Sequence, residues 1–310
     1  MKLGIQNSEY TRVHGMETGY RKMYAHGYRY ADFQKLLNTE KEFFIQPLAS
    51  FENELKEERK IAEDAGIQFS QAHGPWRYPP RERNAEEIRI RIDEFKKSIY
   101  GTAVIGSPNW IIHPMMPFGA DTSERAEEMI EINRVAFREI CEYAKTFGIT
   151  VCLENMPFLN LPIASVGSVV DFVRELGYDN LKMCLDTGHS AVFGDDLGDA
   201  VRLIGKDLLA ALHVHDNDGK RDAHWRPGEG VIDWIGFNAA LKEIGYEGVY
   251  SLECGPLRDK EHPETWEENE LKLINTVMGH ISTLKCGEAP AGDYGARRGQ
   301  TTTSSYGCTV

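Results

Sequence analysis

The sequence contains no apolar run that approaches the roughly 20 residues needed to span a bilayer. Its six cysteines include no Cys-x-x-Cys pair, so we expect reduced, mostly buried thiols and neither disulfides nor a zinc–thiolate site. Basic residues are in the minority: the sequence has 35 Lys and Arg and 48 Asp and Glu, which gives a net charge of −13. That balance argues against a broad basic surface for nucleic acid. Residues 1–6 show no secretory apolar segment, so we expect a cytoplasmic protein without membrane contact.

What the sequence does contain is a regular alternation of strand-like and helix-like segments. Most strand candidates are near-continuous apolar runs, which are typical of parallel strands buried on both faces. The apolar stripe of Ile88, Ile92, Phe95 and Ile99 is typical of the amphipathic helices between them. Strands are expected at residues 2–6, 28–33, 67–73, 109–113, 149–154, 181–186, 209–215 and 249–253.

Eight strands and about eight helices in strict alternation predict an α/β fold, the closed (β/α)8 or TIM barrel. An open doubly wound sheet is the alternative, but eight repeats within residues 1–285 favour closure. We expect one catalytic barrel domain over 1–285 and a tail over 286–310 that is extended or disordered, since it is rich in Gly, Ser and Thr and has no periodicity. Asp121 followed by Glu124 predicts the start of a helix after the fourth strand.

Six successive strands end in residues of the kind that bind metals. In a barrel of this type the C-terminal ends of all strands face one mouth, where active sites lie. The six strand-end motifs therefore predict one convergent site and not scattered surface charge. They are Gln-Ala-His73-Gly, Ile-Ile-His113-Pro, Cys-Leu-Glu154-Asn, Cys-Leu-Asp186-Thr-Gly-His189, His213-Val-His215-Asp and Ser-Leu-Glu253-Cys.

Glu154, Asp186, His215 and Glu253, which we call the quartet, end the last four strands. Three carboxylates and one imidazole make a hard, mixed oxygen–nitrogen site suited to one divalent metal ion. We expect Mn²⁺, with Zn²⁺, Co²⁺ and Mg²⁺ as alternatives. A single acid at a strand end is more often a helix cap or a loop hydrogen bonder, but four in a row predict a metal site. His213 faces the same side as His215, and we expect it to be an interior residue of a second layer.

With these motifs the chain resembles the xylose isomerase-like barrels. That superfamily includes sugar phosphate isomerases and epimerases, ketose 3-epimerases and endonuclease IV. The resemblance covers residues 1–285, and it is strongest at a few short motifs. They are Leu-Glu154-Asn, Leu-Asp186-Thr-Gly-His189, His215-Asp-Asn-Asp218, and Pro227-Gly-Glu-Gly230 followed by Ile232-Asp-Trp.

The resemblance to the epimerases implies a metal-dependent isomerase or epimerase that acts on a sugar or sugar phosphate. The quartet would hold the metal, which would polarise the substrate oxygens. Glu154 and Glu253 would also be the catalytic acid/base pair, transferring protons on opposite faces of the sugar through an enediolate. His189 and Arg221 match residues that contact substrate oxygens in that family.

Further substrate contacts are expected at the mouth. His73, His113 and His224 would bind sugar hydroxyls in such an enzyme. Trp76 and Trp225 lie in mouth loops, where an aromatic plane can pack against the apolar C–H face of a sugar; ordinary loop packing is the equal alternative. The expected partner is a small-molecule sugar or sugar phosphate and not nucleic acid, and a homo-oligomer through the outer helices is compatible with this fold.

Two other activities fit the same residues. The chain also resembles endonuclease IV, a three-zinc phosphodiesterase on abasic DNA, and the Asp222-Ala-His224 pair is its most specific match. A lyase could use the same proton abstraction on a keto-sugar or an oxidised glycoside. The positions that match the zinc ligands of endonuclease IV are His73, His113, Glu154, Asp186, His189, His215, Asp222, His224 and Glu253.

Overall fold

The computed structural model of the protein describes residues 2–80, 82 and 84–254, together with 265, 268, 269, 273, 275–277 and 279. The expected tail over 286–310 lies outside the described residues, and so does part of the expected domain's C-terminal end. Among the helices of the described part, none combines the length and the hydropathy that a membrane span requires. Cys141, Cys152, Cys184 and Cys254 are buried free thiols, in agreement with the expectation from the sequence.

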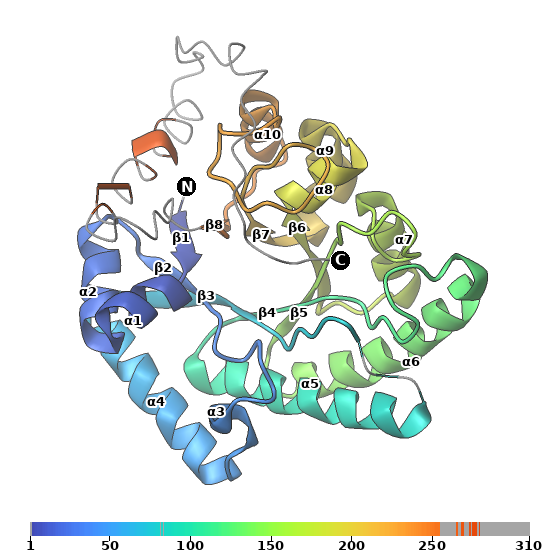
Figure 1. Ribbon diagram of the computed structural model, residues 1–310, viewed down its shortest axis with the longest axis horizontal. Helices are drawn as coiled ribbons and strands as arrows, with labels where there is room; N and C mark the ends of the chain where they lie inside the picture. Colours follow the sequence, from blue (N-terminus) through green and yellow to red (C-terminus); the bar gives the residue numbers. More distant parts are fainter. Residues whose placement is uncertain are drawn as a thin grey trace.

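Eight parallel strands form the centre of the molecule, and all eight match the expected segments (Figure 1). They are hydrogen-bonded in the order β7-β6-β5-β4-β3-β2-β1-β8. The edge strands β7 and β8 meet through one parallel bridge between Val214 and Leu252, so the sheet is a nearly closed barrel. The strands are β1 Lys2–Gln6, β2 Tyr30–Phe33, β3 Gln68–His73, β4 Asn109–Ile112, β5 Thr150–Glu154, β6 Leu181–Asp186, β7 Leu209–His213 and β8 Val249–Leu252.

Helices lie around the strands, as the view in Figure 1 shows. Ten α-helices and one 3-10 helix lie within residues 2–254, more than the eight expected, because short helices such as α3 and α8 are added to the barrel repeat. The expected helix start at Asp121 was wrong: a 3-10 turn at Ser123–Arg125 comes first, and α6 begins at Ala126 without a side-chain cap. The α-helices are α1 Ser8–His14, α2 Met16–Ala25, α3 Glu42–Ile45, α4 Leu48–Asp64, α5 Ala85–Ile105, α6 Ala126–Lys145, α7 Val166–Leu176, α8 Thr187–Phe193, α9 Leu197–Leu208 and α10 Trp234–Glu243.

A small apolar layer fills the inside of the barrel below the mouth. Ile111, Cys152, Cys184 and Ala211 are buried together there, apart from the large core between strands and helices. Each of them lies two residues before a residue of the strand-end motifs. Because side chains two positions apart on a strand point to the same side, the motif residues continue the barrel interior upward into the mouth.

The core between the helices and the strands predicts a clear contrast within α10. Phe237 is fully buried and packs edge-on against Trp234 and Tyr250, whereas Ile235 on the same helix is 47% exposed. Phe237→Ala should lower the free energy of unfolding by about 3–5 kcal/mol, since it leaves a cavity. Ile235→Ala should change it by less than about 0.5 kcal/mol. Urea unfolding followed by circular dichroism compares the two, and equal losses would contradict this packing.

Candidate active site

The quartet converges at the carboxyl ends of the strands. Glu154 and Asp186 are the last residues of β5 and β6, and Glu253 directly follows β8. His215 lies two residues beyond β7, and its Nε2 is 2.9 Å from Asp186 Oδ2. Glu154, Asp186 and His215 are buried, and the Glu253 side chain is only 13% exposed.

His213 lies at the centre of the carboxylates. Its ring is fully buried, with Nδ1 2.9 Å from Glu154 Oε1 and Nε2 2.9 Å from Asp32 Oδ2. The same Nδ1 is 3.2 Å from Glu253 Oε2. His213 is therefore an interior residue, as the sequence predicts, and it also contacts both glutamates of the quartet.

His73 and His113 approach Glu154 from the other side. Nε2 of His113 is 3.1 Å from Glu154 Oε2, and Nε2 of His73 is 3.8 Å from the same oxygen. The His73 ring also stacks on His213 with an interplanar angle of 11°. Burial and the neighbouring His113 lower the pKa of His73 to about 4, so His73 is a neutral imidazole at neutral pH.

Asp222 joins the other histidines on the opposite side of the mouth. Its Oδ2 is 3.3 Å from His189 Nε2 and 3.0 Å from His224 Nε2, and its side chain is 29% exposed. His224 stacks on His215 with ring centroids 4.2 Å apart. Burial alone would lower the pKa of His189, but Asp186 and Asp222 raise it to about 10. This side of the mouth therefore carries a cationic imidazole between two carboxylates.

The two glutamates of the quartet differ in their electrostatic surroundings. Burial alone would raise the pKa of Glu154, but His213 and His113 hold it well below its usual range. The pKa of Glu253 is raised to about 8, because burial and the charges of Glu154 and Asp186 outweigh the effect of His213 and His224. A divalent cation bound beside them would lower the pKa of both carboxyls.

Short-range contacts fix the end of β6. Asn155 forms two hydrogen bonds with the backbone of Asp186, at 2.8 and 3.0 Å. Asp186 in turn caps α8, since its Oδ1 accepts from the His189 N–H at 2.6 Å. A Cβ on Gly188 would lie 1.9 Å from Cε1 of His215, so the close approach of α8 to this imidazole requires glycine.

The buried carboxylate of Asp216 organises the loop that follows His215. It accepts hydrogen bonds from the N–H groups of Gly228 and Ile232 and from the indole of Trp234. A Cβ on Gly230 would lie 2.0 Å from Asn217 O. The Pro-Gly-Glu-Gly motif is therefore a turn that shapes the mouth before α10.

The remaining predicted residues lie at the rim. Arg221 is 55% exposed and its Nε is 3.5 Å from Asp218 Oδ2, so it stays outside the histidine–carboxylate cluster. The backbone of Trp225 pairs with Asp216 in an antiparallel bridge. The ring of Trp76 lies edge-on to His113 with centroids 4.5 Å apart.

Sequence reasoning missed Asp32, Asn155 and Asp216. Asp32 lies in β2, is fully buried, and binds both His213 and Gln71. Asp32 is an acid near the end of its strand, as in the six motifs, but the last residue of that strand is the apolar Phe33. The sequence therefore did not single it out. Asn155 and Asp216 each follow a quartet residue directly. That position next to an expected metal ligand could have marked them as residues that support the site.

The donor atoms at the mouth fit a divalent metal. Several groups of His and acidic side chains lie with their ligand atoms within 4.8 Å of one another. Carboxylate oxygens together with imidazole nitrogens are the donor set that such an ion takes. Each quartet residue belongs to at least one of the groups. These include His73 with His113 and Glu154, Asp186 with His189 and His215, and His215 with His224 and Glu253.

Comparison with known proteins gives a consistent picture. Residues 21–276 match the family model described as xylose isomerase-like TIM barrel. An uncharacterized protein of Methanocaldococcus jannaschii is 30% identical, over 66% of this chain and 71% of that protein. D-psicose 3-epimerase of Agrobacterium fabrum is 28% identical, over 64% of this chain and 68% of the epimerase. A crystal structure of the IOLI protein with a bound zinc atom has a TM-score of 0.71 at 18% identity, covering 92% of this chain and 99% of that one.

The contact between α8 and His215 predicts the effect of one added methyl group. Gly188→Ala must push the His215 ring or α8 aside, and overpacking of this kind costs about 1–3 kcal/mol. Gly167→Ala is the matched control, because this glycine lies in α7 with no neighbouring atom within 4 Å of the added Cβ. The control should be neutral or more stable by up to about 1 kcal/mol. A thermal melt of Gly188→Ala that equals that of the unaltered protein would refute the close approach.

Proposed function

We infer the function of this chain from its family: it belongs to the xylose isomerase-like TIM barrels, and we propose that it is a metal-dependent isomerase or epimerase acting on a sugar or sugar phosphate. One observation carries the proposal. The carboxylates of Glu154 and Glu253 reach the same His213 nitrogen from β5 and from the end of β8, at 2.9 and 3.2 Å. Two carboxyl groups that converge in this way can bracket one small substrate. The similarity to a D-psicose 3-epimerase supports the same reaction class.

Glu154, Asp186, His215 and Glu253 would hold the metal ion. When bound, the ion would polarise the carbonyl and hydroxyl oxygens of the sugar, which makes the adjacent C–H more acidic. Hard oxygen donors with one imidazole suit Mn²⁺, our first choice, and also Zn²⁺, Co²⁺ and Mg²⁺. Zinc in the structurally similar IOLI protein agrees with this range of metals.

The chain's own residues would move the proton. One carboxylate of the Glu154–Glu253 pair takes it from the carbon next to the carbonyl, and the other glutamate delivers a proton to the opposite face or to the neighbouring carbon. His213 contacts both glutamates and would keep them in position. His73, His113, His189 and His224 would donate or accept hydrogen bonds at the sugar hydroxyls, and burial of the site keeps competing water out.

The acid/base role of Glu253 is tested by an isosteric change. Glu253→Gln should keep much of the metal affinity, because the amide oxygen can still coordinate, but deuterium transfer from solvent into a ketose should fall at least about a thousandfold. Glu243→Gln is the control, since Glu243 is exposed and pairs with Arg202 on the outer surface. NMR follows the exchange and elemental analysis the metal content. Turnover retained in Glu253→Gln would refute the acid/base role.

The endonuclease IV-like alternative is kept open by a specific observation. Groups outside the quartet, such as His73 and His113 with Glu154, could hold a metal ion of their own, and Asp222 Oδ1 lies 3.5 Å from His215 Nε2. The sugar enzyme should hold one exchangeable divalent ion per chain, whereas a nuclease of that type should hold three zinc ions and incise an abasic duplex. Elemental analysis after dialysis against Mn²⁺ and Zn²⁺ distinguishes them. Three tightly held zinc ions, together with no deuterium exchange into any ketose, would contradict the proposed sugar isomerase or epimerase.

A further inference from the structure

A row of buried polar side chains crosses the interior of the barrel. This polar row consists of Gln71 of β3, Asp32 of β2 and His213 of β7, none of which is more than 1% exposed. Gln71 Nε2 lies 3.1 Å from Asp32 Oδ2, and the same oxygen lies 2.9 Å from His213 Nε2. Since β1 and β8 lie between β2 and β7, these contacts join strands that are not neighbours in the sheet.

Gln71 fixes the direction of the hydrogen bonds in the polar row. Its Nε2 also lies 3.2 Å from Leu212 O, so one amide group faces two acceptors and must present its nitrogen to both. A carboxylate oxygen only accepts, so Asp32 Oδ2 receives one hydrogen bond from Gln71 and a second from His213. The His213 nitrogen that donates to Asp32 is therefore Nε2.

The other ring nitrogen of His213 faces the two glutamates of the quartet. Nδ1 lies 2.9 Å from Glu154 Oε1 and 3.2 Å from Glu253 Oε2. The His73 ring lies against one face of the imidazole, with centroids 5.5 Å apart and planes inclined by 11°. A rotation of the ring would separate Nε2 from Asp32 and Nδ1 from both carboxyl groups at once. The contact with Asp32 therefore fixes where Nδ1 lies.

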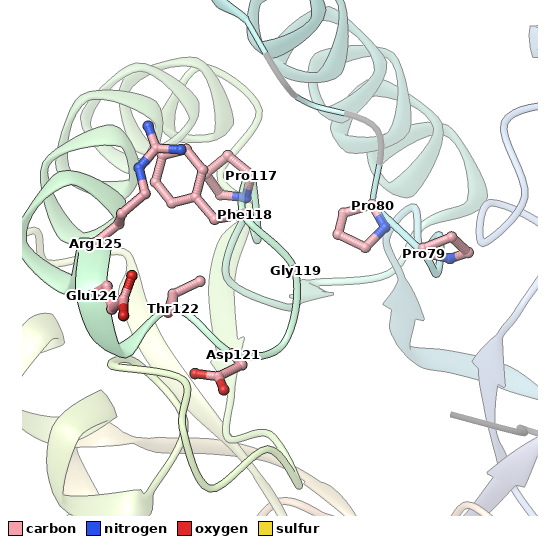
Figure 2. A pocket seen from close by; sticks show the side chains of 9 residues that line it. All are labelled: Pro79, Pro80, Pro117, Phe118, Gly119, Asp121, Thr122, Glu124 and Arg125. Atoms are coloured by element: carbon pink, nitrogen blue, oxygen red, sulfur yellow. The ribbon is translucent and has the colours of Figure 1, made fainter.

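The open groove at the rim is not part of this arrangement. A groove of about 640 Å³ is lined by Pro79, Pro80 and residues of the segment 117–125 (Figure 2). No member of the polar row lines it. A substitution of Asp32 therefore acts inside the barrel, and the contact through which it reaches the glutamates is the one with His213.

We propose that Asp32 is a positioning residue for the reaction: together with Gln71 it holds the His213 ring so that Nδ1 stays between Glu154 and Glu253. The inference rests on the proposed function, which makes those glutamates the proton-transferring pair. Asp32 acts through His213 and transfers no proton itself. Outer partners that orient a metal site in this way typically change metal affinity or activity about 10–100-fold when they are replaced.

The orientation of the ring is measured without turnover. Long-range 1H–15N NMR spectra of protein labelled with 15N-histidine report which ring nitrogen carries hydrogen, and His213→Gln assigns the signal. We expect hydrogen on Nε2 of His213, both metal-free and with Zn²⁺. In Asp32→Leu that hydrogen should be lost, because only Nδ1 then faces an acceptor. An Nε2 without hydrogen in the unaltered protein would overturn the proposal.

Kinetics test whether the ring acts on the glutamates. At saturating Mn²⁺, Asp32→Leu should lower kcat for deuterium exchange into a ketose about 10–100-fold and leave KM nearly unchanged. Gln71→Met keeps the carboxylate but removes the donor, and it should cause a smaller loss of kcat. Glu58→Met is the matched control, because Glu58 of α4 is 3% exposed and accepts from Tyr20 and Lys35 away from the mouth. It should lower the melting temperature and leave kcat unchanged.

A double substitution decides whether Asp32 acts through His213. In a His213→Gln background, Asp32→Leu should lower kcat no further, since the ring that it holds is gone. Losses that multiply, or an equal loss in Glu58→Met, would overturn the positioning role.

Metal affinity separates this role from the proposed function. Asp32→Leu should weaken Mn²⁺ binding about tenfold in a chelator competition, because Glu154 and Glu253 would also be metal ligands. An unaltered protein that exchanges no deuterium would refute the proposed function, and the affinity difference would still support the hold of Asp32 on the two glutamates. An unchanged affinity together with an unchanged kcat would overturn that hold.

Discussion

The mouth of this barrel depends on the mutual pairing of ionisable side chains that have almost no access to water. An unpaired buried charge costs several kcal/mol, so each buried carboxylate must have an imidazole, a cation or several N–H donors beside it. His213 shows the constraint most clearly, because one fully buried ring contacts Asp32, Glu154 and Glu253. The groups of carboxylate and imidazole donors around Glu154, Asp186 and His215 are where a cation would fit.

The barrel supplies the geometry that this pairing needs. Alternation along each strand directs every second side chain inward, so a layer of Ile111, Cys152, Cys184 and Ala211 supports the polar layer above it. Two glycines also allow the backbone to pass close to the residues of the mouth. Gly188 lets α8 contact His215, and Gly230 lets its turn pass close to Asn217.

Much of this architecture could be predicted from the sequence. Apolar runs located all eight strands, and the family and the barrel are confirmed. Site residues were visible where a strand ended in an acid or a histidine. Asp32 was not, because its role depends on a contact with His213, 181 residues away in the chain.

We propose that the quartet forms one metal centre between two proton-transferring glutamates. A crystal structure grown with Mn²⁺ and a slowly reacting ketose, with anomalous scattering recorded, would locate the metal and the sugar together. We expect a single anomalous peak bound by Glu154, Asp186, His215 and Glu253, with the sugar between the two glutamates. Peaks on the His73–His113 pair and the Asp222–His224 pair, or a sugar bound away from the glutamates, would contradict it.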